Sequence, residues 1–359
     1  MTTYRAGVIG HTGRGNYGHS LDTVYLGMEE INLVAVADAD PDGLVAAGDR
    51  LRVDSRNCYL DYRQMLEQEQ LDIVSVAPRW LDQKHDMVIA AAESGVRGIF
   101  CEKPFAPTLA QADAMIAACD RAGVKIAVSH QGRVGQVAHK TRELLAGGAV
   151  GKVKEVISGG KQDHRGGGQD LMVLGTHSLD MLCFLFGHPR WVQAYVLQDG
   201  RDAGPDDARQ GDEEIGPILG NHLEATYAFD NGIMATFHSH RRQVRPGPRP
   251  GGLEIHGTEG ILMQRDGYLL HCPHPNWNPA MTEPAWKVVL EPSNPGFDTL
   301  NAYMVRDLIA AFEEGREPIS SGHDARWALE MILGVYTAHR HGRTPLPLTD
   351  REHPLRDWV

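Results

Sequence analysis

Four glycines near the start of the chain could bring bare backbone up to a phosphate group. They lie in GVIGHTGRGNYG (residues 7–18), directly behind a short apolar run, and are Gly10, Gly13, Gly15 and Gly18. The last three read Gly-x-Gly-x-x-Gly. Because glycine has no Cβ, such a turn lets backbone N–H groups approach a pyrophosphate at the start of a helix, which we expect over residues 19–30. A tight turn without a ligand is the alternative interpretation of these residues alone.

An acidic residue at the end of the next apolar run fits the same chemistry. Asp38 closes NLVAVAD (32–38), where a carboxylate accepts hydrogen bonds from ribose hydroxyls. The same charge repels a 2′-phosphate, and no arginine follows it in DADPDG. The sequence therefore predicts a dinucleotide site that takes NAD rather than NADP.

The elements that must hold these residues alternate along the first part of the chain. Short runs rich in β-branched residues fall at residues 4–10, 32–38, 71–78, 96–104 and 124–130. Between them, residues 87–95 and 109–123 repeat apolar side chains every three or four positions and end at glycine, as amphipathic helices do. This alternation predicts an α/β domain over residues 1–128, with a doubly wound parallel sheet of the Rossmann type.

Longer and more polar strands are expected beyond residue 128. They are predicted at residues 152–161, 190–198 and 222–240, and the Asn-Gly of FDNGIM indicates a hairpin within the last of these. Helices are expected around 135–147, 177–186, 297–315 and 324–342, and loops at 245–252 and 277–286. Residues 129–359 are therefore predicted to form an α+β domain with an open, mostly antiparallel sheet.

Composition excludes several classes of partner. The 359 residues include 47 acidic and 35 basic side chains, a formal net charge of −12, which disfavours nucleic acid and anionic membrane surfaces. No apolar run approaches the length of a membrane helix. The five cysteines form no CxxC pair, so neither a disulfide framework nor a thiolate zinc site is expected. We expect a cytoplasmic protein.

Several motifs together resemble one protein family. They are SVAP (75–78), CEKP (101–104), SHQGRV (129–134), the Gly-x-His-x-x-Asp of residues 175–180 and the closing stretch 323–348. The chain resembles the glucose–fructose oxidoreductase, inositol dehydrogenase and MocA family over essentially its whole length. This resemblance implies an NAD-dependent oxidoreductase. The cofactor contacts implied by the glycine turn and the resemblance together are Gly10, Gly13, Arg14, Gly15, Asn16, Asp38, Pro78, Glu102 and Lys103.

The resemblance also implies the catalytic residues Lys103, His177 and Asp180. Oxidation of a CH–OH group needs a base for the hydroxyl proton, and an imidazole near its ordinary pKa suits that task. An ammonium group stabilises the developing alkoxide. The sequence departs from the family at Val173, where many members carry an aspartate four residues before the histidine. Asp180, the substrate or Asp170 must then orient His177.

Polar side chains close to these motifs are candidates for contacting the substrate. They are Gln131, Arg133, Lys161, His164, Arg165 and Asp170. Such donors suit a polyhydroxylated or carboxylated ligand, although a solvated loop is the simpler interpretation of residues 159–170. His238 and His240 would share one face of a strand, but no metal-ligand framework accompanies them, and we expect no metal.

The function predicted is hydride transfer between NAD and a CH–OH group of a sugar, cyclitol or related polyol, by a homodimer or homotetramer. One alternative is an NAD-dependent glycoside hydrolase or lyase that works through transient oxidation and elimination. A non-catalytic NAD sensor on the same fold is another.

Overall fold

The computed structural model describes residues 3–242, 252–273, 286–293 and 295–359. The predicted loop at 245–252 and the predicted loop at 277–286 lie almost entirely outside these residues. Contacts within the chain define two compact units. The first holds residues 1–134, 212–215 and 295–326, and the second holds 135–211, 216–294 and 327–359. The division of the chain into two domains, 1–128 and 129–359, stays a prediction.

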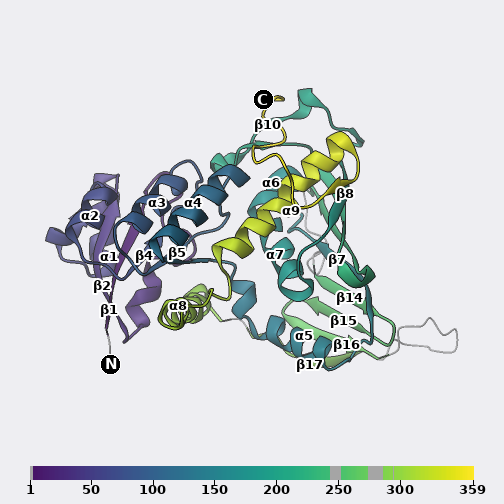
Figure 1. Cartoon of the computed structure of the whole chain (residues 1–359), viewed down its shortest axis with the longest axis horizontal. Coiled ribbons are helices and arrows are strands. Elements are labelled where there is room, and N and C mark those ends of the chain that lie inside the picture. The colour runs from purple at the N-terminus through teal and green to yellow at the C-terminus, as the bar shows by residue number, and fades with distance from the viewer. Residues whose placement is uncertain (1–2, 243–251, 274–285, 294) are drawn as a thin grey trace. The chain divides into compact units, whose positions relative to one another are not determined.

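A six-stranded parallel sheet forms the centre of the first unit (Figure 1). Its order is β3-β2-β1-β4-β5-β6, so the chain moves outward from β1 first in one direction and then in the other. The strands are β1 (Tyr4–Gly10), β2 (Ile31–Asp38), β3 (Cys58–Tyr59), β4 (Ile73–Val76), β5 (Gly98–Cys101) and β6 (Lys125–Val128). This is the doubly wound order of dinucleotide-binding sheets, and it confirms the predicted fold class.

Helices cover both faces of this sheet. They are α1 (Pro41–Leu51), α2 (Tyr62–Gln68), α3 (Lys84–Glu93), α4 (Leu109–Ala122) and α8 (Phe297–Glu314). Ala6 and Val8 join the core formed with α1 and α8, whereas the next residue of β1, Gly7, faces Leu71 and Met65 of the opposite layer. Both faces of each strand are therefore apolar, as buried parallel strands require.

The second unit contains a mixed ten-stranded sheet (Figure 1). In spatial order its strands are β17 (Lys287–Leu290), β16 (Tyr268–Cys272), β15 (Ile261–Arg265), β14 (Leu253–Gly257), β7 (Val153–Gly159), β13 (Met234–His240), β12 (His222–Ala228), β8 (Trp191–Gln198) and β18 (Thr344–Pro345), with β9 (Arg201–Asp202) paired to β8. Among the described strands of this second sheet, only β7 and β13 pair in parallel, so the predicted, mostly antiparallel sheet is confirmed.

The Asn-Gly hairpin fixes the register of two central strands in this sheet. Asn231 and Gly232 have φ values of 62° and 75°, which bring β12 back against β13. His222 consequently lies opposite His240, and Glu224 opposite His238. Leu223, Ala225, Tyr227 and Phe237 point to the buried face, and most of the alternate residues are partly exposed.

Four helices belong wholly or partly to the second unit: α5 (Gln136–Ala146), α6 (Gly168–Val173), α7 (Gly175–Phe186) and α9 (Gly322–His341), of which residues 322–326 belong to the first. The Tyr227 hydroxyl donates to the carbonyl of Met331 on α9 at 3.1 Å. The side-chain amide of Gln264 on β15 donates to the Thr141 hydroxyl of α5 at 2.9 Å. None of the helices described is long and apolar enough to span a bilayer.

A buried histidine near the C-terminus makes stability depend on pH. His353 is 4% exposed, its Nδ1 accepts the backbone N–H of Leu355, and burial lowers its pKa to about 4. The folded state therefore binds fewer protons than the unfolded state between pH 6.5 and 4. We expect the free energy of unfolding to be highest above pH 6.5 and to fall by up to about 3 kcal/mol as the pH drops to 4.

Urea unfolding at several pH values measures this dependence. His353→Asn should remove most of it, whereas His164→Asn, a change at a solvent-exposed histidine, should not. Equal pH slopes in the wild-type protein and His353→Asn would refute the assignment.

Candidate functional site

The glycine-rich turn does not lead into an α-helix. Residues 11–22 form consecutive turns, followed by the short 3-10 helix η1 (Thr23–Gly27). The helix expected over residues 19–30 is therefore wrong. Asn16, Gly18 and Ser20 have φ values of 52°, 61° and 62°, and each left-handed residue interrupts a right-handed helix.

Asp38 holds this turn against the end of β2. Its carboxylate accepts the Thr12 backbone N–H at 3.0 and 3.1 Å, the Thr12 hydroxyl at 2.7 Å, the Tyr17 hydroxyl at 2.7 Å and the Asp40 N–H at 3.0 Å. Asp38 is only 1% exposed. A carboxylate offers about four acceptor positions, so the protein's own donors use all of them.

Tyr17 is the one member of this group whose side chain crosses the turn. Its ring lies directly over Gly10, where a Cβ would come within 2.1 Å of the ring. Burial, followed by the hydrogen bond to Asp38, raises the pKa of the Tyr17 hydroxyl, so it remains a proton donor. Gly10 is therefore needed for close approach of the tyrosine in this conformation.

The other predicted cofactor residues of the turn lie beside it. The Arg14 guanidinium lies 2.5 Å from an Asp82 carboxylate oxygen and over the Trp80 ring, and Asn16 accepts the Gly13 N–H at 3.1 Å. A Cβ at Gly13 would meet nothing within 4 Å, so the turn presents bare backbone at this point. Pro78 follows β4, and the carboxyl ends of β1, β2 and β4 share one sheet edge.

Glu102 is a second buried carboxylate at that edge. It is 0% exposed, accepts the Ser129 hydroxyl at 2.9 Å and lies 2.7 Å from His19 Nδ1. Burial alone would raise its pKa, but the His19 hydrogen bond and the charges of Lys103, His19 and Lys84 outweigh it and lower the pKa. Because His19 follows the glycine turn, this contact joins the turn to the Glu-Lys-Pro segment.

Lys103 is held by its neighbours on both sides. Its N–H donates to Ser129 Oγ at 3.1 Å, and the side chain is buried. The buried Lys84 ammonium of α3 donates to the carbonyls of Glu102 and Pro104, at 2.7 Å each. Burial lowers the pKa of Lys84. Sequence reasoning missed Lys84 and Ser129, because only their long-range contacts distinguish them from ordinary helix and strand-end residues.

The predicted catalytic histidine lies at the start of α7, as expected for the Gly-x-His-x-x-Asp motif. His177 is half-buried in the first turn, and Asp180 is 1% exposed one turn later. Val173, at the end of α6, is buried. These residues belong to the second unit, whereas Lys103 belongs to the first.

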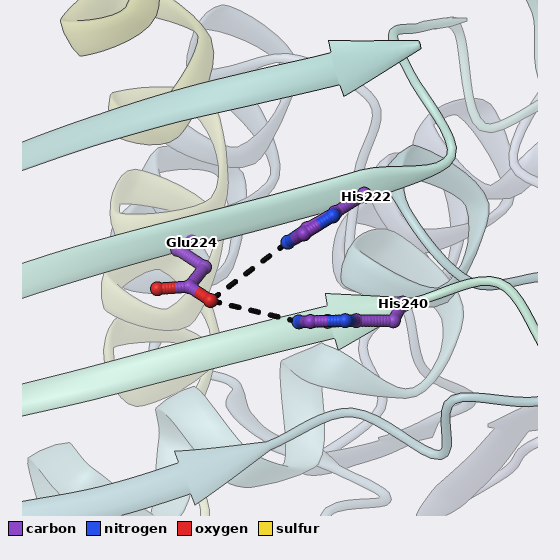
Figure 2. A group of neighbouring side chains, drawn as sticks. All are labelled: His222, Glu224 and His240. Atoms are coloured by element: carbon purple, nitrogen blue, oxygen red, sulfur yellow. Dashed lines mark ion pairs between the residues drawn. The ribbon is translucent and has the colours of Figure 1, made fainter. Parts of the chain in front are cut away.

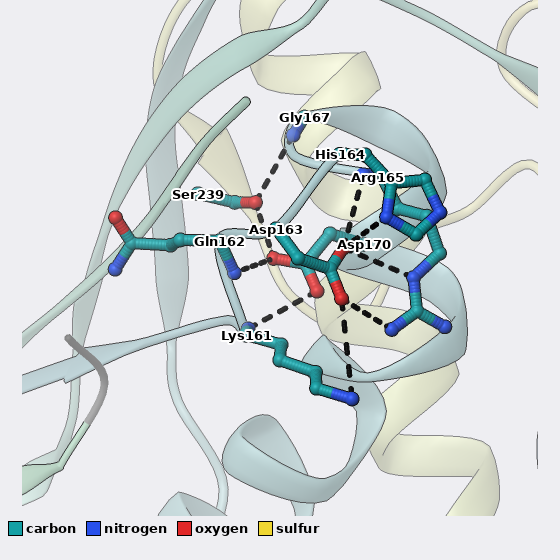
Figure 3. A network of polar contacts seen from close by, with 8 residues as sticks. All are labelled: Lys161, Gln162, Asp163, His164, Arg165, Gly167, Asp170 and Ser239. Carbon is teal, nitrogen blue, oxygen red and sulfur yellow. Dashed lines mark hydrogen bonds and ion pairs between the residues drawn. The ribbon is translucent and has the colours of Figure 1, made fainter. Parts of the chain in front are cut away.

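A third buried carboxylate organises the glycine-rich loop ahead of His177 (Figure 3). Asp170 is 0% exposed and accepts the N–H groups of Lys161 and Gln162 at 3.1 Å each and the Ser239 hydroxyl at 2.5 Å. A Cβ at Gly160 would lie 2.0 Å from an Asp170 oxygen, so only glycine fits there. In this conformation Asp170 is a positioning residue for the loop.

The cationic candidates of the same loop gather around Asp163 (Figure 3). The Arg165 guanidinium donates to both carboxylate oxygens, at 3.0 and 2.6 Å, and this holds the pKa of Asp163 well below its usual range. Lys161 Nζ lies 3.9 Å away and His164 Nδ1 3.8 Å away. Three basic side chains therefore converge on one acidic group.

Gln131 and Arg133 lie in the first unit rather than with this loop. Both are buried in the 3-10 helix η3 (Gln131–Val134). The Gln131 amide donates to Asn301 at 3.1 Å, and Arg133 donates to the Ile319 carbonyl and pairs with Asp324. Their role in binding a substrate stays a prediction.

Asp170→Asn tests how the loop is held. The amide NH2 would replace one acceptor oxygen and so oppose one or two of the three donors, and we expect a loss of about 1–3 kcal/mol of unfolding free energy. Amide exchange by mass spectrometry should show faster exchange over residues 160–168. Asp163→Asn is the matched control, because it removes a side-chain bridge but leaves the backbone contacts of Asp170. Unchanged exchange in Asp170→Asn would contradict this role.

Comparisons with known proteins agree with this architecture. Residues 4–130 match the model of the oxidoreductase family with an NAD-binding Rossmann fold, and residues 138–263 match the GFO/IDH/MocA C-terminal domain. D-apiose dehydrogenase from Paraburkholderia graminis is 31% identical over 87% of this chain and 82% of its own length. Myo-inositol 2-dehydrogenase from Thermotoga maritima is 26% identical over 72% of this chain and 74% of its own.

A solved structure of levoglucosan dehydrogenase with NADH and L-sorbose shares the fold, with a TM-score of 0.75 at 20% identity, over 97% of this chain and 100% of that one. The sheet order, the family matches and these relatives agree: the chain belongs to the Gfo/Idh/MocA family and is an NAD-dependent oxidoreductase.

Proposed function

We propose that this enzyme oxidises a CH–OH group of a sugar, cyclitol or related polyol, with Lys103 and His177 as its catalytic residues. The contact between His19 and Glu102 carries the proposal, because it fixes the Lys103 segment to the glycine turn that follows β1. D-apiose, levoglucosan and myo-inositol, the substrates named for relatives of this chain, are all polyhydroxylated. They support the same class of substrate here.

The residues at the sheet edge fit NAD. Gly13 offers open backbone, and the donors now bound to Asp38 are hydroxyl and N–H groups of the same hydrogen-bonding type as ribose hydroxyls. When bound, NAD supplies the acceptor for a hydride. Asp38 would be the residue that holds a ribose hydroxyl, in exchange for one of its present donors.

The chain's own residues supply the proton chemistry. As the C–H bond of the CH–OH group breaks, the proton of the substrate's hydroxyl group passes to a neutral ring nitrogen of His177. The Lys103 ammonium stabilises the negative charge that develops on the oxygen of this hydroxyl group. Asp180 orients the imidazole from one turn further along α7. Val173 cannot take that role, because it is apolar and buried.

The loop of residues 161–170 supports recognition of the substrate. Lys161, His164 and Arg165 provide N–H donors around Asp163, and Asp170 holds the backbone beneath them. A polyol offers hydroxyl oxygens to such donors. Asp170 shapes this loop, and Gln131 and Arg133, which lie in the first unit, are proposed as further contacts to the substrate.

We also propose a cytoplasmic homodimer or homotetramer. All five cysteines are free thiols, which suits a reducing compartment. Alternate residues of β12 and β13 leave one sheet face partly exposed, and a second copy of the chain would cover it. Light scattering behind size exclusion measures the assembly.

Lys103→Ala tests the catalytic assignment. We expect NADH formation from a panel of sugars and inositols, including D-apiose, levoglucosan and myo-inositol, to fall at least a hundredfold, because general acid–base and electrostatic groups contribute about that much. NAD binding, measured by calorimetry, should persist. His177→Asn should lower turnover similarly and flatten its pH profile, and Lys140→Ala on α5 is the control.

Other outcomes would contradict the proposal. No NADH from any member of the panel would argue against a polyol dehydrogenase. Cleavage of glycosides without net NADH would favour the hydrolase or lyase. Full turnover by Lys103→Ala would exclude this lysine from the chemistry, and an NAD-binding protein without turnover would point to a sensor.

Tyr17→Phe tests whether the protein's own hydroxyl competes with the cofactor at Asp38. Loss of a buried hydrogen bond to a charged group should cost about 1.5–3 kcal/mol of unfolding free energy. NAD affinity should rise, by about fivefold if one acceptor position worth about 1 kcal/mol is released. Tyr25→Phe is the control, because that buried hydroxyl bonds Ser75 instead. Weaker NAD binding by folded Tyr17→Phe would mean that the hydroxyl itself contacts the cofactor.

A further inference from the structure

A cluster of metal-ligating side chains lies on β12 and β13, outside the residues assigned to the reaction (Figure 2). His222 and Glu224 alternate along β12 and so share a face, and His240 lies directly opposite His222 on β13. The ligand atoms of all three lie within 4.8 Å of one another. The hairpin register therefore brings two imidazoles and one carboxylate together.

Both imidazoles direct an unpartnered nitrogen toward the carboxylate. His222 Nε2 and His240 Nε2 are inaccessible to solvent and have no hydrogen-bond partner among the residues that the structure describes. Glu224 Oε1 lies 3.8 and 3.6 Å from them, beyond hydrogen-bond distance. A buried polar atom without a partner costs free energy, so this arrangement calls for something between the three groups.

The spacing suits a small divalent ion. Zinc bonds to histidine nitrogen and carboxylate oxygen at about 2.0–2.2 Å, which in tetrahedral geometry separates the ligand atoms by about 3.3 Å. The observed 3.6 and 3.8 Å need to close by only a few tenths of an ångström. Two nitrogen ligands in three disfavour Mg²⁺ and Ca²⁺, which prefer oxygen.

We propose that His222, Glu224 and His240 bind a divalent transition ion of the zinc class, one per chain. Three protein ligands leave at least one position open, as in zinc sites that bind water or another small ligand. A surface hollow lined by Asp199, Gly200, Asn221 and Arg241 adjoins the two histidines on this side. The site departs from the expectation of no metal, and it stands apart from the proposed hydride transfer.

A protonated histidine paired with Glu224 is the competing explanation. The two imidazole rings lie 3.8 Å apart at 30°, so a positive charge on both would be repulsive. A protonated histidine beside Glu224 would also form a charge-assisted hydrogen bond, which is shorter than the 3.6 and 3.8 Å between these atoms. Neutral imidazoles are the form that binds a metal.

Zinc titration of the untagged full-length protein, stripped with a chelator, tests the site. Calorimetry in competition with a chelator of known affinity should give one Zn²⁺ per chain, confirmed by elemental analysis after desalting. We expect His240→Ala and Glu224→Gln each to weaken binding at least tenfold, since even indirect partners of metal ligands commonly contribute that much. Zinc should raise the melting temperature of the wild-type protein but not that of His240→Ala.

His256→Ala is the matched control. His256 lies on the same sheet, with its Nε2 3.3 Å from Glu254, but no second histidine joins that pair in the described part of the chain. Its loss should leave zinc affinity unchanged. Equal affinity in the wild-type protein, His240→Ala and His256→Ala, or no stoichiometric zinc in the wild-type protein, would overturn the site. Calorimetric NAD binding by each variant reports folding independently of zinc and of the proposed activity.

Discussion

Three carboxylates that are removed from water, Asp38, Glu102 and Asp170, determine how the loops around the site are held. A buried carboxylate is tolerated only when N–H or O–H donors replace its hydration. Glu102 accepts a hydrogen bond from the Ser129 hydroxyl and lies against His19. These contacts hold Glu102 in place directly before Lys103. Asp38 and Asp170 meet the same requirement with donors from the glycine turn and from residues 161–162. Each loop is therefore ordered by a charge at its base rather than by its own secondary structure.

This arrangement explains why bare glycine segments can be functional and still be well defined. The turn after β1 has no helix of its own, yet Thr12 and Tyr17 are tied to Asp38. The buried ammonium of Lys84 donates hydrogen bonds to the carbonyls on both sides of Lys103. These contacts hold the backbone on both sides of Lys103 in place.

Much of the architecture follows from sequence patterns that act locally. The parallel strands are recognisable because both faces are apolar, and the end of α4 at Gly123 and the Asn231–Gly232 hairpin depend on single turn residues. Lys103 and His177 are candidates for another reason, because Glu-Lys-Pro and Gly-x-His-x-x-Asp resemble motifs of the family. The helix after the glycine turn was predicted wrongly, because left-handed Asn16, Gly18 and Ser20 belong to a turn that Asp38 stabilises from a distance.

Contacts between distant segments account for what the sequence did not indicate. In the sequence, Lys84 is simply one polar residue of an amphipathic stretch. Only the structure shows that its ammonium donates to the Glu102 carbonyl. The sequence places His240 on the same strand face as His238, but the residues that share its proposed metal site are His222 and Glu224, across the hairpin. The Asn-Gly turn contained the missing signal: a hairpin centred on Asn231 pairs His222 with His240. Register, rather than spacing along one strand, identifies that cluster.

The most direct test of the central claim is the fate of the hydrogen on the reacting carbon. A sugar or polyol that the enzyme oxidises should be labelled with deuterium at the carbinol position, and the reduced cofactor analysed by mass spectrometry. Direct hydride transfer predicts one deuterium in each molecule of NADH formed. Unlabelled NADH, or label released into water while the substrate reacts, would contradict the account.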